Sequence, residues 1–214
     1  MIRRFNTLFH RLRGVLLLTC GLLSLSVAAP AKEGNAYKID PAQSGFLVNT
    51  GVAGLFKKFG MPLTLEVREY SGEIRFDPGN PAASSVKVHV AAHSVALKTQ
   101  VIEHDRMNIE MRTHEKVLES EKYPDIDYSS DRVKIWKTGA NIYEADVDGT
   151  LSLHGKSRQL PLRATLTLRG NRLEAAGEVT LSQKEFGIKT YGYEGGALRV
   201  ADAVKVSFNL VAVR

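Results

Sequence analysis

The sequence predicts an all-β protein, a closed antiparallel barrel of about eight strands with one inserted α-helix. Apolar and polar residues alternate along most of the chain after residue 36, as in strands that bury one face. Turn-forming residues separate these stretches, and only residues 99–120 show the spacing of a sizeable helix. A closed barrel pairs both edges of such a sheet, and its interior is filled by side chains or holds one small apolar ligand.

The first residues predict a secretory leader. Four arginines and no acidic residue lie in residues 1–13, and residues 14–27 are almost wholly apolar. A basic start, a short apolar run and small residues after it are typical of a signal peptide, whereas a membrane span needs about 20 apolar residues. We therefore predict a signal peptide at 1–28 with cleavage near residue 28 or 31, a polar tail at 29–36 and one domain at 37–214. The mature protein is expected in the periplasm.

The charge and the cysteine content also change when the leader is removed. The chain has a net charge of +6, and the leader contributes four of these positive charges, which leaves +2. This balance does not predict a surface that binds nucleic acid. Cys20, the only cysteine, lies in the leader, so the mature domain contains no disulfide.

The N-terminal half of the domain reads as strands that end at turn residues. Residues 37–52 predict a first strand broken around 41–45, and residues 53–60 predict a single helical turn. Further strands are predicted at 63–69, 71–76 and 85–91, with a strong turn at 77–81.

The one sizeable helix is predicted at 99–120. Met107, Met111, His114 and Leu118 fall at helical spacing, and Thr99 is a suitable N-cap. The Tyr-Pro-Asp sequence at 123–125 ends this segment.

The C-terminal half returns to strands. Residues 143–153 and 159–168 predict a hairpin whose turn, residues 154–157, is a little longer than the two-residue type. Pro161 is expected where strand pairing is interrupted, because proline has no N–H to donate. Other strands are predicted at 125–136, 173–181 and 203–213, with a short helical turn at 182–188 and a loop at 190–196.

Five short motifs in this order and spacing resemble the YceI-like family of secreted bacterial lipid-binding proteins. They are SGEIRFDP at 71–78, ASSV at 83–86, EKYPDI at 121–126, GTLSLHG at 149–155 and FGI at 186–188. The resemblance covers residues 37–213 and implies an extended, lipocalin-like antiparallel barrel with a helix packed against it. It also implies that the barrel holds a polyisoprenoid or a similar amphiphile. Residues 107–119 depart from the family pattern, so the resemblance leaves the identity of the ligand open.

Eleven apolar residues are candidates for the lining of a ligand channel. Ordinary core is the alternative for each of them, because any barrel strand has an inward face. The most informative candidates lie at 55–59 and in the predicted helix, outside the regular strands, where an opening would be covered. Methionine side chains adapt to a flexible ligand. The candidates are Phe46, Val48, Leu55, Phe56, Phe59, Phe76, Met107, Met111, Leu118, Phe186 and Ile188.

No enzyme motif occurs in the chain. There is no Gly-x-Ser-x-Gly, His-Glu-x-x-His or phosphate-binding loop, and the mature domain has no cysteine nucleophile. The histidines at 89, 93, 104, 114 and 154 show no metal-ligand spacing and are expected on the solvated surface. We therefore expect no catalytic residue, no metal and no cofactor.

These observations predict a non-catalytic periplasmic carrier for a long-chain amphiphilic lipid of the polyisoprenoid or isoprenoid quinone type. A dry channel binds such a tail without specific polar contacts, because each buried methylene contributes about 0.8 kcal/mol. The alternatives are a filled barrel that serves as a structural or protein-interaction module, and an enzyme that acts on the bound lipid. The expected partner is the lipid and not nucleic acid; transient contact with a membrane or membrane protein and a homodimer stay open.

Overall fold

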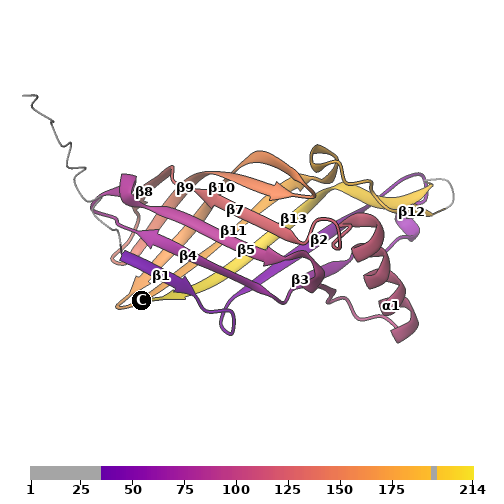
Figure 1. Ribbon diagram of the computed structural model, residues 1–214, viewed down its shortest axis with the longest axis horizontal. Helices are drawn as coiled ribbons and strands as arrows, with labels where there is room; N and C mark the ends of the chain where they lie inside the picture. Colours follow the sequence, from indigo (N-terminus) through magenta and orange to yellow (C-terminus); the bar gives the residue numbers. More distant parts are fainter. Residues whose placement is uncertain (1–34, 194–196) are drawn as a thin grey trace, which may run out of the picture. The chain divides into compact units, whose positions relative to one another are not determined.

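The computed structural model describes residues 35–193 and 197–214, which contain thirteen strands and one α-helix (Figure 1). The strands are β1 (Asn35–Ile39), β2 (Gly45–Ala53), β3 (Thr64–Val67), β4 (Tyr70–Phe76), β5 (Ser85–Ala91), β6 (Val95–Leu97), β7 (Asp125–Ser130), β8 (Val133–Lys137), β9 (Ile142–Leu153), β10 (Lys156–Arg169), β11 (Arg172–Ser182), β12 (Gly192–Tyr193) and β13 (Leu198–Val213). The helical segments are α1 (Glu103–Arg112), the π-helical turn η4 (Thr113–Val117) and the 3-10 turns η1 (Lys57–Phe59), η2 (Pro81–Ala83), η3 (Ala92–Ser94) and η5 (Gln183–Phe186). The predicted leader, residues 1–28, lies outside the described residues.

Eight of the strands close into a ring. Their order is β1-β4-β5-β7-β9-β10-β11-β13, and β13 pairs back with β1 through Lys38–Val213 and Ile39–Ala212. Every pair in this ring is antiparallel. The predicted antiparallel barrel of about eight strands with an inserted helix is therefore confirmed.

The long strand β13 explains why the first strand is broken. Its C-terminal end pairs with β1, and residues 199–209 of the same strand pair with β2. Between the two, the Ser44 hydroxyl accepts a hydrogen bond from Val211 N at 2.9 Å, and the Asp40 carboxylate accepts one from Ala42 N at 3.0 Å. β1 and β2 thus act as one interrupted strand, as the turn residues at 41–45 predicted.

Strands β2, β3 and β6 extend one wall of the barrel, and α1 covers the edge of this extension. Leu97 in β6 donates its N–H to the Glu110 carboxylate at 2.9 Å and accepts a hydrogen bond from Arg106 at 3.0 Å. Side chains of α1 therefore satisfy backbone groups that another strand would otherwise pair. Among the helices of residues 35–193 and 197–214, none combines the length and apolar character needed to cross a membrane.

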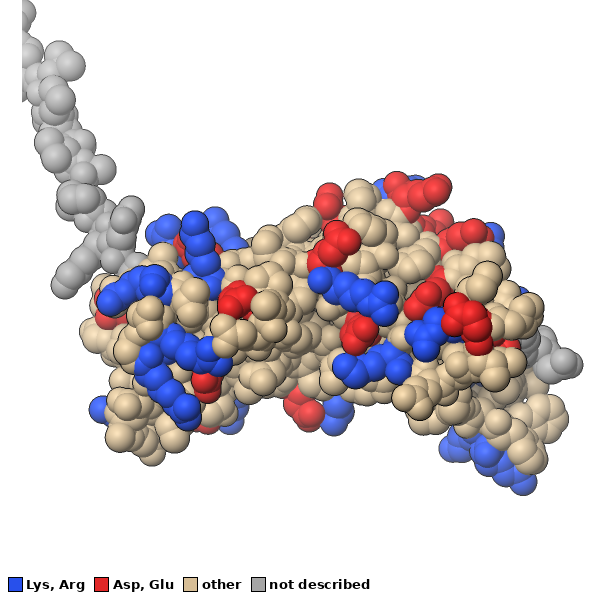
Figure 2. Space-filling model, turned by 90° about the horizontal axis from the view of Figure 1, so that it is seen from below, with Lys and Arg blue, Asp and Glu red and all other residues tan. Residues whose placement is uncertain are grey.

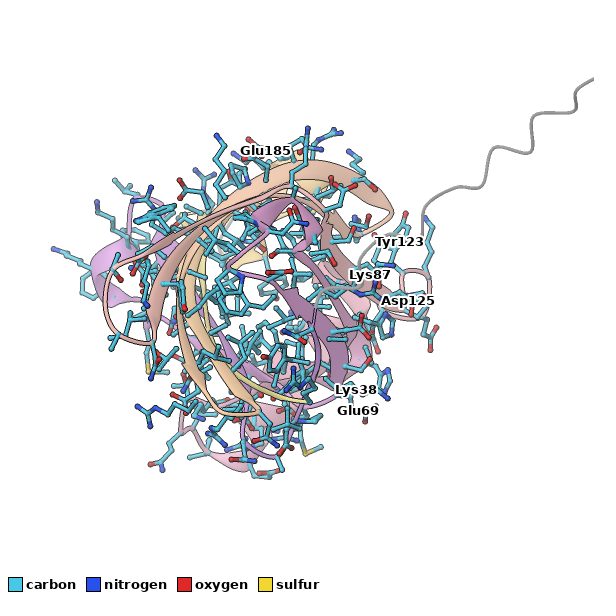
Figure 3. All side chains as sticks on the ribbon, turned by 90° about the vertical axis from the view of Figure 1, so that its left-hand side faces the viewer. Lys38, Glu69, Lys87, Tyr123, Asp125 and Glu185 are labelled. Atoms are coloured by element: carbon cyan, nitrogen blue, oxygen red, sulfur yellow. The ribbon has the colours of Figure 1, made fainter. Side chains whose placement is uncertain are left out.

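The barrel interior contains two apolar clusters. One packs the β1–β4 end around Phe76 and Leu173, which are 1% and 0% exposed, and Phe76 contacts Tyr143 edge-to-face at 5.2 Å. The other cluster consists of Leu151, Leu153, Leu181, Phe186, Ile188 and Val204. Lys87 and Asp125 are exposed on the outside of the barrel, as the view along it shows (Figure 3).

Several predicted boundaries differ from the structure. Asn35 and Ala36, predicted in the polar tail, begin β1. The predicted helix at 99–120 begins only at Glu103, because the Thr99 hydroxyl accepts a hydrogen bond from Thr64 N at 2.8 Å and ties that residue to β3. The predicted strand at 125–136 is two strands, β7 and β8, that pair with successive parts of β9.

The β9–β10 hairpin also differs, because its turn has only two residues. Lys156 pairs with Leu153, so His154 and Gly155 alone form the loop. Their φ angles are 52° and 70°, the positive values that a type I′ turn requires at both central positions. Lys156 and Ser157, predicted in the turn, belong to β10.

Candidate functional site

A cavity of about 690 Å³ lies inside the barrel. Inward-facing residues of β9 from Ala145 to Leu153 line it, so it follows roughly 27 Å of this strand at 3.4 Å per residue. The volume falls in the usual range of ligand sites, about 300–1,000 Å³. The interior is therefore not completely filled by side chains, and its long, narrow form suits an extended molecule.

The middle of the cavity is apolar and carries no charged side chain. Val48, Leu162 and Val206 line it together with Tyr128, which contacts both interior clusters. The Tyr128 hydroxyl donates a hydrogen bond to Leu160 O at 3.1 Å. Burial, and then the negative charge of Asp148, raise the pKa of the Tyr128 hydroxyl well above its ordinary value, so this group stays neutral.

Gly149 makes room for the Tyr128 ring. A Cβ atom at position 149 would lie 2.1 Å from the tyrosine hydroxyl oxygen, closer than any packed pair of atoms allows. Gly149 stands in β9 opposite Leu160 of β10. The absence of a side chain at position 149 leaves space for the Tyr128 ring to lie over β9, with its hydroxyl bonded to Leu160 O of β10.

Polar groups gather where α1 meets the cavity. Asp105, Asn108, Ile109 and Arg112 line it, at the spacing of one helix face. The Arg112 guanidinium lies 4.9 Å from the centre of the Tyr191 ring, and it also donates a hydrogen bond to the Tyr191 hydroxyl. This α1 end of the cavity can therefore accommodate a polar group on an otherwise apolar ligand.

The opposite end of the cavity also has polar residues. Arg75, Ser84 and Ser85 line it there, close to the paired strands β4 and β5. Arg75 Nε donates a hydrogen bond to the Glu73 carboxylate at 2.8 Å. The cavity is thus an apolar channel between two polar ends.

Five of the predicted lining residues lie on the cavity wall: Phe46, Val48, Phe76, Leu118 and Ile188. Phe186 is 1% exposed and packs in the cluster behind the wall, and its carbonyl lies 3.3 Å from Nδ1 of His154. As contacts to a ligand, these positions stay predictions.

The other five predicted lining residues are exposed and do not line the cavity: Leu55, Phe56, Phe59, Met107 and Met111. The methionines lie on a different face of α1 from Asp105, Asn108 and Arg112, which face the cavity. The backbone holds the 53–60 turn, as Phe56 N donates to Ala197 O at 2.9 Å, while its side chains point outward. The predicted apolar residues of the 53–60 turn and of α1 therefore do not lie on the side of these segments that faces the cavity.

Several residues that line the cavity were not predicted from the sequence. Asp105, Asn108 and Arg112 are polar residues of the kind normally found on the solvent face of a helix, and Tyr191 lies in a loop with no periodic pattern. Tyr128 and Leu160 follow the same alternation as every inward-facing strand residue, so nothing in the sequence distinguished them as lining residues. A helix face that combines Asp105, Asn108 and Arg112 could have been recognised only from knowing that the barrel end lies beneath it.

Three of the five histidines in the described residues pair with acids: His89, His93 and His154. His89 Nδ1 lies 2.9 Å from Asp127 Oδ1, and His93 Nε2 lies 3.4 Å from Glu69 Oε2. Across residues 35–193 and 197–214, no three His, Cys, Asp or Glu side chains are placed to hold a metal ion. His154 corrects the prediction of solvated histidines, because its side chain is only 9% exposed and its Nε2 lies 2.7 Å from the Glu119 carboxylate.

Comparison with known families agrees with this geometry. The YceI-like domain matches residues 37–212, nearly all of the described chain. The chain belongs to the YceI-like family. Protein YceI of Escherichia coli O157:H7 is 30% identical over 187 residues, which cover 81% of this chain and 87% of that protein. A UPF0312 protein of Pseudomonas paraeruginosa is 31% identical over 164 residues, covering 72% of this chain and 76% of the relative.

Solved structures share the fold of this YceI-like chain. BcnA of Burkholderia cenocepacia superposes with a TM-score of 0.64 at 22% identity, covering 82% of this chain and 99% of BcnA. A polyisoprenoid binding domain from Saccharophagus degradans, implicated in plant cell wall breakdown, gives a TM-score of 0.61 at 15% identity, with 83% and 97% covered. At these identities the similarity establishes the lipocalin-like barrel and nothing further about the ligand.

Proposed function

We propose that this YceI-like protein is a non-catalytic periplasmic carrier or reservoir for a long-chain isoprenoid-type lipid. The observation that carries the proposal is the channel of about 690 Å³, which is apolar along its middle and polar at its ends. Water is a poor solvent for a hydrocarbon tail, and each methylene buried in such a channel contributes about 0.8 kcal/mol. The polyisoprenoid-binding structure with the same fold supports the choice of ligand class.

The polar groups near α1 suit a small head group of the kind that a quinone or a prenol carries. Asn108 and Arg112 offer N–H donors beside the hydroxyl of Tyr191. A carbonyl or hydroxyl oxygen can accept hydrogen bonds from such donors while the tail follows β9. The head group thereby remains near the surface of the barrel.

Export to the periplasm is supported by the predicted leader at 1–28. A carrier in that compartment would exchange lipid with membranes or membrane proteins, and transient contact with them belongs to this proposal. The first test is to produce the complete chain, recover it from the periplasmic fraction without detergent and measure its N-terminus. We expect a start near residue 29 or 32, and a solvent extract that contains an isoprenoid lipid by mass spectrometry.

A pair of α1 variants tests whether the lipid occupies the channel. Ile109 faces the cavity and Met107 does not, so Ile109→Asp places a charge against the ligand while Met107→Asp adds one to the surface. A further charge inside the cavity is costly to bury, and we expect Ile109→Asp to lower the recovered lipid at least tenfold. Met107→Asp should retain the wild-type amount, and both variants should keep a β-type circular dichroism spectrum.

The alternative functions make different forecasts for the same experiment. A filled structural barrel yields an extract without lipid, and an interaction module gives the same lipid content for both variants. An enzyme acting on the lipid would convert the recovered compound when it is added back to the protein. Either of the first two results would contradict lipid carriage, and conversion would contradict the non-catalytic assignment.

A further inference from the structure

The turn around η1 exposes an unusual group of apolar side chains. Leu55 is 83% exposed, Phe59 73%, Met61 54% and Phe56 46%, and the rings of Phe56 and Phe59 lie 6.3 Å apart. We call these four residues the 55–61 patch. Single exposed apolar residues are common, but several together mark an interaction surface.

Positive charge accompanies the patch. Lys57 and Lys58 lie in the same turn, and Lys58 Nζ is 5.0 Å from the centre of the Phe59 ring. Residues 41–65 contain these two lysines and no aspartate or glutamate. In Figure 2, basic side chains beside uncharged surface project at the lower right of the barrel. Aromatic and aliphatic residues next to lysines are typical of proteins that bind at the surface of an anionic membrane.

The patch continues directly into the cavity. Met61 is both exposed and part of the cavity lining, and Gly60, Val52 and Gly51 line the cavity beside it. The cavity therefore reaches the surface at Met61. A lipid tail that leaves a bilayer at the patch would meet the apolar side chains of Met61 and Val52 as it enters the barrel.

Backbone hydrogen bonds hold the turn in the form that presents these side chains. Phe59 N donates to Phe56 O at 2.9 Å, Gly60 N donates to Lys57 O at 3.2 Å, and Phe56 N reaches Ala197 O at 2.9 Å. Gly60 cannot be replaced freely, because a Cβ there would lie 2.5 Å from Val52 Cγ1. A surface fixed in this way does not lose much conformational entropy on binding.

We propose that the 55–61 patch docks this protein on the surface of a bilayer that contains anionic phospholipids. Leu55 and Phe59 insert at the boundary between head groups and acyl chains, and Lys57 and Lys58 contact the phosphates. The direction of lipid transfer rests on the proposed carrier function, whereas the docking does not depend on it.

A second copy of the chain fits this surface less well than a bilayer. A stable protein interface buries about 1,200–2,000 Å² in total, far more than one short turn provides. In a two-fold dimer the same patch would face itself and bring two pairs of lysines together. An extended anionic surface neutralises these lysines instead.

The test is flotation with vesicles of phosphatidylcholine alone and of phosphatidylcholine with phosphatidylglycerol. The wild type and all variants carry the same N-terminal residues, whether or not the leader has been cleaved. Differences in vesicle binding between them therefore come from the substituted residues. The wild-type protein should float with the anionic vesicles, less so with neutral ones and less at high salt. Leu55→Ser/Phe59→Ser should lower binding at least tenfold. Lys57→Glu/Lys58→Glu should lower it about 25-fold or more, because each lysine contributes about fivefold.

Matched controls come from β8 and the start of β9. Trp136 and Ile142 are 39% and 43% exposed, and Trp136→Ser/Ile142→Ser removes apolar surface far from η1. Lys134→Glu/Lys137→Glu makes the same change of charge there as the lysine variant in the patch. Both controls should bind vesicles as the wild type does.

The outcomes separate docking from lipid carriage. Patch variants that lose vesicle binding but retain extractable lipid support docking and leave the carrier function intact. A wild type that binds vesicles but contains no lipid contradicts only the carrier function. Equal losses in patch and control variants, or a wild type that does not float, would overturn the docking proposal. So would a wild-type dimer in light scattering that Phe59→Ser converts to a monomer.

Discussion

Asp202 shows how one carboxylate organises the wall beside the cavity. It accepts a hydrogen bond from the Ser182 hydroxyl at 2.6 Å and one from Lys184 N at 2.9 Å, and so holds the start of η5 against β13. The Ser182 hydrogen bond and then the Lys184 N–H lower the pKa of the Asp202 carboxyl below its ordinary value. The folded protein therefore favours the ionised form more than the unfolded chain does.

The sign of this shift predicts how Asp202→Asn behaves with pH. A lowered pKa in the folded state contributes stability above the unfolded pKa, about 4, and this contribution disappears as pH falls through the folded pKa. Asp202→Asn should therefore lower the melting temperature near pH 7 and have a smaller effect near pH 3. Thermal unfolding at both pH values measures it. The exposed Asp131→Asn is the control, and an equal loss for both variants would contradict this role.

Single residues also show which parts of the channel lining could be predicted from the sequence and which could not. Phe46, Val48 and Phe76 were predicted to line the channel because strand alternation gives an inward face, and the cavity wall includes them. Met107 was predicted to line the channel because it lies outside the strands, where an opening would be covered, but its side chain is 61% exposed. The apolar residues of a helix mark its buried face only where the surface that it covers is also apolar. The α1 end of the channel is polar, so the apolar residues of α1 did not mark the face that covers it.

At the scale of elements, most strands could be predicted and most turns could not be placed to the residue. A strand with one wet face imposes period two on the sequence, and that signal recurs in β5, β9, β10 and β13. Turn lengths depend on pairing partners, which alternation does not specify. The turn was predicted to span four residues, 154–157, but it has only two because Lys156 pairs with Leu153 across the hairpin.

The two-residue turn of the β9–β10 hairpin leads to a test with an internal control. Gly155 and Gly170 have φ angles of 70° and 62°, so alanine at either position meets similar backbone strain. A Cβ at Gly155 would lie 2.7 Å from Tyr123 Cε1, whereas nothing lies within 4 Å of one at Gly170. Both variants should lose about 1–2 kcal/mol from strain. Gly155→Ala should lose roughly 1–3 kcal/mol more from overpacking.

Denaturant unfolding of the two variants measures this difference. It reports how strongly the hairpin packs against Tyr123, whose ring lies 4.3 Å from the ring of His154. Equal losses of unfolding free energy would show that the tyrosine moves aside freely. In that case the contact would not hold the hairpin to the segment that follows η4.

At the scale of the whole molecule, closure of the barrel rests on contacts between the two ends of the domain. Lys38 pairs with Val213, and no local pattern in either segment specifies that register. The alternation and the number of strands favoured a closed barrel, because closure pairs both edges of the sheet, and the family resemblance added its lipocalin-like form. The cavity likewise depends on how much of the interior the inward side chains leave empty, which a list of apolar residues does not reveal.

A channel that holds a lipid should make the folded state depend on that lipid. A ligand that binds only the folded protein adds about 2.7 kcal/mol of stability at 100 times its dissociation constant. In a domain of this size 1 kcal/mol shifts the melting temperature by about 2–4 °C, so removal of the lipid should lower it by about 5–10 °C.

The lipid can be removed by unfolding the protein in guanidinium on an apolar resin and refolding it without the resin. The melting temperature should fall after this treatment and recover when the extracted lipid is added back. Ile109→Asp, which is expected to hold little lipid, provides the control, and its melting temperature should not change. If the wild type lost its lipid with no change in melting temperature, the lipid would not occupy the channel, because occupancy of an apolar interior must stabilise the barrel around it.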